Sequence, residues 1–327
     1  MKNDVSWPIR RILSLLALAA LLPALILVVA VSLERRHHET GEALDQGLAL
    51  VRSLAAQQAS ATEGLRQMLG VIALLPEAQN QDRAALTPIF QAQLRENPAY
   101  ANILMTDLSG LVTVTAVPSS LASEGPVSLA DRRQFSQALS VGGFAAGGYI
   151  LGRHATVPAL PFALPVFGPD QTPRAVLMAA FRLDAYRRFL AQADLPPGAW
   201  VDFLDADGVR IFGYPETRDR APGERIADRI WDRLNTEGKD EGWFLDETPS
   251  QGNMLRTYGR LRLAGAPEPY LTVLMSLAEA EAFKDADALA LRFLLFLAGA
   301  TLLALFSARW VGERAIGWPC GTLSRRG

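Results

Sequence analysis

Hydrophobic positions are concentrated toward the two ends of the chain. No charged residue occurs from Ile12 to Leu33. A helix of this length, rising 1.5 Å per residue, would reach about 33 Å, enough to cross the hydrocarbon core of a bilayer. Residues 12–33 are therefore predicted to form a transmembrane helix. Pro23 lies inside it and predicts a kink, which a membrane helix tolerates.

The same segment has features of a cleaved signal peptide. Lys2, Arg10 and Arg11 supply a charged start, and small residues at 30–32 supply an end suited to cleavage. The apolar region of a signal peptide normally has about 7–15 residues. The longer apolar run here favours an anchor that is retained.

A second apolar segment, residues 288–308, is predicted to cross the membrane after a linking helix that starts near residue 281. It carries Arg292 near its beginning, where a long side chain can reach the headgroups, and Trp310 marks the opposite interface. The alternative is a buried helix of a soluble core. The run at 294–297 is apolar on every face, which favours the membrane.

The long block between the two apolar segments decides the predicted orientation. Basic residues flank the first segment about equally on both sides, but large domains are translocated largely regardless of charge. We therefore expect residues 34–287 outside the cytoplasm, and residues 1–11 and 309–327 inside it. The single cysteine, Cys320, would then lie where thiols stay reduced.

Residues 34–75 are predicted to form a long helix, the stalk. Its apolar residues recur with a heptad spacing, as in a coiled coil, which predicts a homodimer through the stalk and the transmembrane helices. Polar Gln58 and Thr62 interrupt the seam. The alternative is an amphipathic helix that packs on its own domain, and both can hold along different stretches. The two seam positions are occupied by Leu48, Ala55, Thr62 and Leu69, and by Leu44, Val51, Gln58, Leu65 and Ile72.

Two hairpins share one pattern about a hundred residues apart. Residues 101–117 and 200–212 each have an apolar strand, an Asp-x-x-Gly turn and a second apolar strand. A helix should follow each hairpin, at 130–139 and at 224–235. Further strands are expected at 148–152, 158–167 and 174–183 and, in the second copy, at 242–246, 255–263 and 270–277.

The repeat predicts an α+β fold in which two modules with antiparallel sheets are mounted on one long helix. The first module covers residues 76–190 and the second residues 191–280, divided near the turn at Pro196-Pro197-Gly198. With the two apolar segments, the prediction is a two-module block flanked by two transmembrane helices.

Composition excludes several classes of function. The chain has 32 basic and 34 acidic side chains among its 327 residues, so it lacks the basic surplus of an electrostatic nucleic-acid binder. One cysteine excludes a disulfide framework and a cysteine-based zinc site, and three histidines leave little for another metal centre. We expect no nucleic acid and no metal.

Catalytic and cofactor motifs are also missing. The run from Asp205 to Gly208 imitates part of a calcium loop, but Phe203 and Tyr214 stand where ligands are required. No phosphate-binding glycine loop and no Gly-x-Ser-x-Gly elbow occur. We therefore expect no cofactor, no catalytic residue and no enzymatic activity.

Short motifs at residues 131–135, 148–153, Pro158 and 165–166 resemble those of the double Cache sensor domains of bacterial membrane receptors. The resemblance covers roughly residues 36–285. It implies two PAS-like modules outside the bacterial inner membrane. It also implies that the first, membrane-distal module holds a small ligand between its sheet and its connecting helix and loops.

By position, the resemblance implies five candidate pocket residues: Asp131, Arg132, Phe135, Tyr149 and Arg153. Arginine offers a planar fork for a carboxylate and an aromatic ring offers apolar contact, so a small organic anion is the first expectation. Pairing of Arg132 with Asp131 and burial of Tyr149 in the core are the alternatives. Members that bind amino acids tend to show Arg-x-Trp-Tyr where this chain has Arg-Arg-Gln-Phe, so the ligand class stays open.

Residues 309–316 resemble the entrance to a HAMP signalling helix. The expectation is the sensory half of a two-pass receptor of the histidine kinase, diguanylate cyclase or chemoreceptor type, without its output domain. Either the reading frame is truncated or a separate output protein is the partner. The alternatives are a membrane-tethered solute-binding protein without signalling output and a structural dimeric envelope protein.

Overall fold

The computed structural model divides the chain into two compact units, residues 44–279 and residues 1–43 with 280–327. Along most of residues 9–40 the description covers the backbone alone. Residues 1–8 and 317–327, which are the outer parts of the two predicted cytoplasmic ends and include Cys320, lie outside the described residues. The residues described are 9–117, 125–151, 158–182, 187, 190, 195–217, 220–248, 252–282 and 284–316.

The smaller unit contains two long helices. The helix α1 (Ile9–Ala73) begins there and continues without a break into the larger unit, so the first apolar segment and the stalk form one helix. Near the other end, α7 (Glu279–Ala282) is followed by α8 (Lys284–Ile316). The described residues include no helix that is both long and apolar enough to cross a membrane. The two-pass topology therefore stays a prediction.

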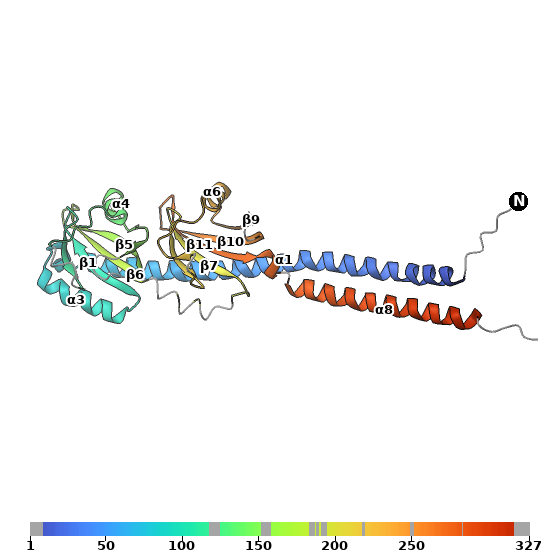
Figure 1. Cartoon of the computed structure of the whole chain (residues 1–327). Coiled ribbons are helices and arrows are strands. Elements are labelled where there is room, and N and C mark those ends of the chain that lie inside the picture. Colours follow the sequence, from blue (N-terminus) through green and yellow to red (C-terminus); the bar gives the residue numbers. More distant parts are fainter. Residues whose placement is uncertain are drawn as a thin grey trace, which may run out of the picture. The chain divides into compact units, whose positions relative to one another are not determined.

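The larger unit contains two antiparallel sheets that repeat one topology (Figure 1). The six-stranded sheet has the order β2-β1-β6-β5-β3 with β4 also on β5, and the five-stranded sheet has the order β8-β7-β11-β10-β9. The strands of the first are β1 (Tyr100–Thr106), β2 (Val112–Thr115), β3 (Ala145–Ala146), β4 (Ile150–Leu151), β5 (Pro158–Phe167) and β6 (Pro173–Arg182). Those of the second are β7 (Trp200–Asp205), β8 (Arg210–Tyr214), β9 (Glu241–Thr248), β10 (Gly252–Arg262) and β11 (Pro269–Ala278).

We call the parts built on these sheets the first module and the second module. The predicted α+β class, the long helix and the two antiparallel sheets are confirmed. Every predicted strand is present, with ends shifted by a few residues. Two helices of the first module were not predicted, α2 (Pro76–Gln79) and α3 (Arg83–Glu96). The side chain of Asp82 caps α3 by accepting hydrogen bonds from the amides of Ala84 and Ala85.

The shared Asp-x-x-Gly letters of the two hairpins produce the same turn. Asp107 Oδ1 accepts hydrogen bonds from the amides of Ser109 and Leu111, both at 2.9 Å. Asp205 Oδ1 accepts from the amides of Asp207 and Val209 at 3.0 and 2.9 Å. The glycine that closes each turn has a positive φ, 85° in the first and 76° in the second.

The helix after each hairpin starts later than predicted, and the physical reason is the same in both modules. The helices are α4 (Arg133–Val141) and α6 (Asp228–Glu237). The residues that precede them pair with the hairpin instead: the amide of Leu129 donates to Gly110 O, and the amide of Ile226 donates to Gly208 O. Chain that is held beside a strand in this way cannot close helical turns. Both helices end at a glycine with φ 64°.

The second sheet lies between two helices. On one face, Tyr258 of β10 and Leu274 of β11 pack with Trp231 of α6. The neighbouring Thr257 points to the other face, where α1 passes so closely that a Cβ on Gly47 would lie 2.9 Å from the Thr257 hydroxyl oxygen. The sheet is therefore covered on both sides.

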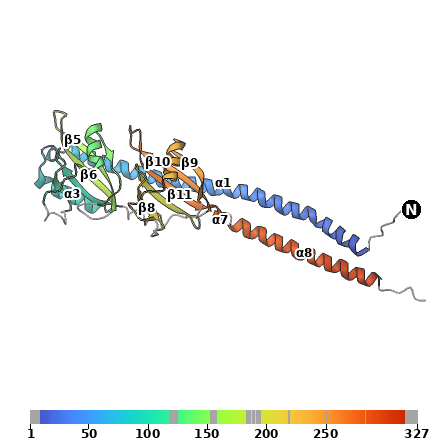
Figure 2. The same ribbon diagram turned by 45° about the horizontal axis from the view of Figure 1, so that its top comes forward.

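The first sheet follows the same plan. Phe135 and Ala138 of α4 are buried against Leu104, Val176 and Met178 of the sheet. The helix α3 contacts β1 and β2. From residue 44 onward α1 runs along both sheets in both views (Figures 1 and 2).

The stalk positions that were candidates for a dimer seam are largely buried within the chain itself. Leu48 and Ala55 are half-buried. Along 44–72 the alternative interpretation, an amphipathic helix that packs on its own domain, is therefore confirmed. A dimer would have to use other faces of this helix. The buried residues of the stripe are Leu44, Val51, Leu54, Gln58, Thr62, Leu65, Leu69 and Ile72.

The second module also buries an ion pair in its sheet. Arg210 Nε donates to Asp202 Oδ1 at 2.8 Å, and the two side chains are only 8% and 2% exposed. Burial raises the pKa of the Asp202 carboxyl above its ordinary value, and the positive charge of Arg210 opposes this change.

Removal of the cation should destabilise the protein in a pH-dependent way. Arg210→Met leaves a buried carboxylate without its bonded partner and should lower the free energy of unfolding by about 3 kcal/mol at pH 7. A carboxyl whose pKa is raised in the folded state contributes stability that is present below the unfolded pKa and lost as the pH rises through the folded pKa. The loss relative to wild type should therefore shrink toward about pH 4.

Denaturant unfolding of the full chain at several pH values measures this loss. The double variant Asp202→Leu/Arg210→Met, which removes both charges, should recover most of the stability. A loss that is equal at pH 4 and pH 7, or a double variant as unstable as the single one, would contradict this assignment.

Candidate functional site

The structure separates the predicted pocket residues. Asp131 is exposed and Arg132 is half-buried, and both immediately precede α4. Phe135 is 6% exposed, and its ring belongs to the hydrophobic cluster between α4 and the first sheet. Tyr149 lies in the segment between β3 and β4. Arg153 lies outside the described residues.

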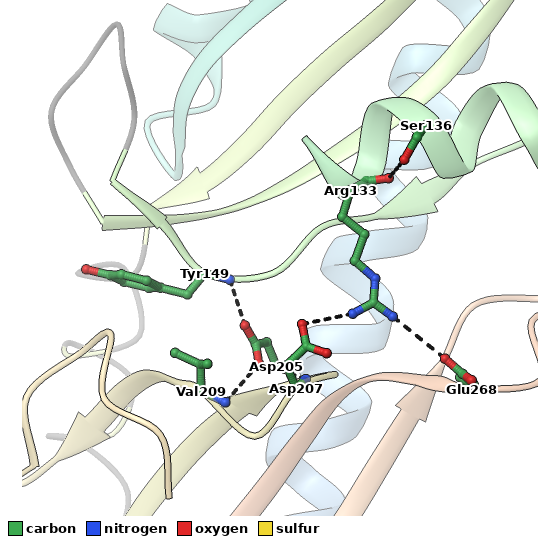
Figure 3. Close-up of polar contacts among 7 residues, drawn as sticks. All are labelled: Arg133, Ser136, Tyr149, Asp205, Asp207, Val209 and Glu268. Atoms are coloured by element: carbon green, nitrogen blue, oxygen red, sulfur yellow. Dashed lines mark hydrogen bonds and ion pairs between the residues drawn. The ribbon is translucent and has the colours of Figure 1, made fainter. Parts of the chain in front are cut away.

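Tyr149 is directed toward the second module and not toward α4. Its backbone amide donates to Asp205 Oδ2 at 2.9 Å. Its ring lies against Gly223, where a Cβ would come within 3.1 Å of the ring. In Figure 3 the ring extends away from Arg133. Asp131, Arg132 and Phe135 thus lie together at the start of α4, while Tyr149 lies at the junction of the two modules.

Asp205 serves both its own turn and this junction. One carboxylate oxygen caps the β7–β8 turn, and the other accepts the amide of Tyr149 (Figure 3). The approach requires glycine at position 148, because a Cβ there would lie 2.8 Å from Asp205 Oδ2. The turn aspartate of the second module therefore also forms a hydrogen bond with a loop of the first module.

Arg133, at the first position of α4, makes the second polar contact of the junction. Its guanidinium lies 3.0 Å from Asp207 Oδ2 and 3.7 Å from Glu268 Oε2, both in the second module (Figure 3). With the Gln137 amide oriented to satisfy its neighbours, the amide oxygen accepts from Arg133 Nε at 3.1 Å. The arginine side chain is 33% exposed, so these contacts lie at the edge of the junction.

Tyr270 makes the buried contact of the junction. It lies at the start of β11 and is 7% exposed. Its ring meets Phe162 of the first sheet edge-on, with 5.7 Å between the centroids, and Phe162 in turn stacks on Phe144 at 5.4 Å. Burial raises the pKa of the Tyr270 hydroxyl to about 12.

The hydroxyl of Tyr270 connects the junction to the long helix. It lies 3.0 Å from Thr62 Oγ1, and Gln58 Nε2 donates to the same oxygen at 3.0 Å. The two polar residues that interrupt the apolar stripe of α1 are therefore the partners of a buried tyrosine. One side chain of the second module thus contacts both the first sheet and α1.

A pocket of about 430 Å³ lies beside these contacts. Its lining combines one face of α4, the segment around β3, the loop between β10 and β11, and Tyr270. Within the part of the chain that the structure describes, no group of three or more histidine, cysteine, aspartate or glutamate side chains is placed to hold a metal ion. The walls suit a small organic molecule.

Sequence reasoning missed the residues of the junction. Arg133 stands in the quoted motif next to Arg132, and nothing in the letters distinguishes the two. Asp205 was explained by its turn alone. A usable signal existed for Tyr270, because Gln58 and Thr62 on a buried stripe require a polar partner.

No family model matches the chain. No curated protein matches it either. Among solved structures, the extracellular domain of a candidate histidine kinase is 18% identical, with a TM-score of 0.59, covering 72% of this chain and 93% of that one. A domain of a candidate sensory box/GGDEF family protein from Vibrio parahaemolyticus is 18% identical, with a TM-score of 0.52, covering 76% and 98%.

The ligand-binding domain of the Pseudomonas fluorescens chemoreceptor CtaA, solved with L-isoleucine, is 12% identical, with a TM-score of 0.56, covering 76% and 98%. These three solved structures are thus an extracellular domain, a domain of a sensory box/GGDEF family protein and a ligand-binding domain. Together with the two repeated sheets on one long helix, they show that the fold is that of a double Cache sensor domain.

Proposed function

We propose that the chain is the extracytoplasmic small-molecule sensor portion of a transmembrane signalling receptor, of the histidine kinase, diguanylate cyclase or chemoreceptor type. The observation that carries this proposal is the two-sheet unit built on one helix. Both chain ends of this unit are helical, since α1 enters it and β11 passes through α7 into α8. The sensor portion itself catalyses no reaction.

The proposal includes a two-pass topology in a bacterial inner membrane. Residues 12–33 and 288–308 would cross the bilayer, with residues 34–287 outside and both termini in the cytoplasm. The support is the uncharged run from Ile12 to Leu33 and the apolar run after Arg292. Ligand binding would then act on two helices, α1 and α8, that enter the same membrane.

The ligand proposed for the first module is a small organic molecule with a carboxylate. Arg132, half-buried at the start of α4, would supply the cation, and Asp131 and Arg153 would border the site, whereas Tyr149 lies at the junction of the two modules. Phe135 would form its floor from within the core cluster. The L-isoleucine in the chemoreceptor structure supports a ligand of this size.

Signalling would pass through a homodimer and an output part. Because the buried stripe of α1 is occupied by the chain's own sheets, the dimer would form through exposed faces of α1 and through the membrane helices. The HAMP-like residues 309–316 would lead to an output domain or contact a separate output protein.

The topology is tested by labelling with a charged maleimide, which does not cross a bilayer. In spheroplasts, a Ser60→Cys variant in a Cys320→Ser background should be labelled, because residue 60 is exposed on α1. The native Cys320 of the unaltered chain should react only after lysis. Labelling of Cys320 in intact spheroplasts, or of residue 60 only after lysis, would reject the topology.

Ligand binding is tested by a thermal-shift screen of small carboxylates and amino acids on the full chain. A binder at one hundred times its dissociation constant adds about 2.7 kcal/mol of stability. Arg132→Met should weaken its binding about ten- to one-hundred-fold, since a hydrogen bond to a charged group contributes about 1.5–3 kcal/mol.

The matched control for this screen is Arg95→Met, at an exposed position in the last turn of α3. It should leave binding unchanged. If no compound of the panel stabilises the protein, or if the Arg132 variant binds as well as wild type, the proposed ligand class is wrong.

A further inference from the structure

The pocket at the junction has the size and placement of a small-molecule site. Its volume of about 430 Å³ falls within the usual range of about 300–1,000 Å³ for ligand pockets. Such sites occur preferentially between domains, and this one lies between α4 of the first module and the β10–β11 loop of the second.

This pocket is distinct from the site proposed in the first module. Phe135 and Ala138 turn one face of α4 into the core of the first sheet. Arg133, Gln137 and Val141, one helical turn apart from each other, line the pocket from another face. An occupant of the pocket would not need the first site, and the inference does not depend on the function proposed above.

The walls of the pocket are mainly apolar and partly aromatic. Val141, 75% exposed, and Phe144 line it from the first module. Leu263, Pro267 and Tyr270 line it from the second. The Tyr270 hydroxyl already has Thr62 as its partner, so the tyrosine offers the occupant its ring.

The charges at the pocket favour a cationic occupant. Among the described residues there, the guanidinium of Arg133 faces two carboxylates, Asp207 and Glu268, and also reaches the Gln137 amide. The neighbouring Arg262 is bonded to Asp240 and to the carbonyl of Pro267.

Of the two carboxylates, Glu268 has the more open position. It is 78% exposed and lies 3.7 Å from Arg133, beyond hydrogen-bond distance. An anion would have to displace carboxylates from Arg133, whereas an ammonium group can bind Glu268 without breaking an existing hydrogen bond.

We propose that the junction pocket binds a small amphipathic amine. The apolar body would lie against Phe144 and Tyr270, and the ammonium would pair with the carboxylate of Glu268 within reach of the aromatic faces. The occupant would contact Tyr270 at the start of β11, the strand that continues into α7 and α8.

Hydrogen exchange on the full chain tests this proposal with three probes of one shape: phenethylamine, 2-phenylethanol and 3-phenylpropionate. Phenethylamine should slow exchange in residues 133–147 and 263–270. The alcohol should bind about tenfold more weakly, because it lacks the charge-assisted contact. The carboxylate should give no protection.

Two substitutions at exposed positions locate the site. Glu268→Gln should lower the affinity for phenethylamine about tenfold and leave that for the alcohol unchanged. Glu96→Gln, at the end of α3 and exposed, is the matched control. Val141→Trp should fill the pocket and abolish protection by both probes, and its surface position keeps the fold intact.

Four results would overturn the proposal. Absence of protection by phenethylamine at about 10 mM would show that the pocket does not bind the amine. Protection that persists in Val141→Trp places the binding elsewhere. Equal binding of the carboxylate, or no effect of Glu268→Gln, rejects the assignment to amines.

Discussion

The buried hydroxyl of Tyr270 is the contact on which the arrangement of the two modules depends. A hydroxyl inside a protein core is costly unless it is hydrogen-bonded. Here the partner, Thr62, lies on α1 and is itself bonded to Gln58. The ring of the same tyrosine packs against Phe162 of the first sheet. Helix, first sheet and second sheet therefore meet at one side chain, and displacement of any one of them would leave polar groups buried without partners.

The polar contacts nearer the surface reinforce this arrangement. Asp205 accepts the amide of Tyr149, and Arg133 pairs with Asp207, so α4 and the loop after it are both held on the β7–β8 turn. The exposed ion pair between Arg133 and Asp207 contributes little to the free energy of folding, because solvent screens it. It does determine which face of α4 is turned toward the second module. The turn that α4 contacts follows β7, and β7 pairs with β11, the strand that carries Tyr270.

Local chemistry explains how much of the fold was predictable. The two hairpins followed from aspartate and glycine at fixed offsets, and Asp107 and Asp205 make the predicted turns. The starts of α4 and α6 were placed too early because the bonds that delay them run to Gly110 and Gly208, which periodicity within a helix cannot reveal. The stripe of α1 was recognised, but its spacing suits a partner chain as well as a sheet of the same chain.

The candidate site was predicted less completely for a related reason. Arg132 and Arg133 are neighbours in the sequence, and nothing in their order indicates that Arg133 reaches the second module. That contact depends on where α4 begins and on a loop more than a hundred residues away, at Glu268. Tyr149 carries an aromatic side chain, and yet its backbone amide makes the contact with Asp205. Contacts made by the backbone, or between distant loops, leave no pattern in a single sequence.

The most direct test of the role of Tyr270 is amide hydrogen exchange of the full chain in Tyr270→Phe, Thr62→Val and the double variant. Loss of the shared hydrogen bond should cost about 1 kcal/mol. Tyr270→Phe should then speed exchange about fivefold in residues 58–65 of α1, in β5 and in β11. Thr62→Val should speed it more, because it also removes the hydrogen bond from Gln58, and the double variant should differ little from Thr62→Val, since the contact with Tyr270 is already lost. Faster exchange confined to the second module, or additive effects, would contradict a junction organised by this contact.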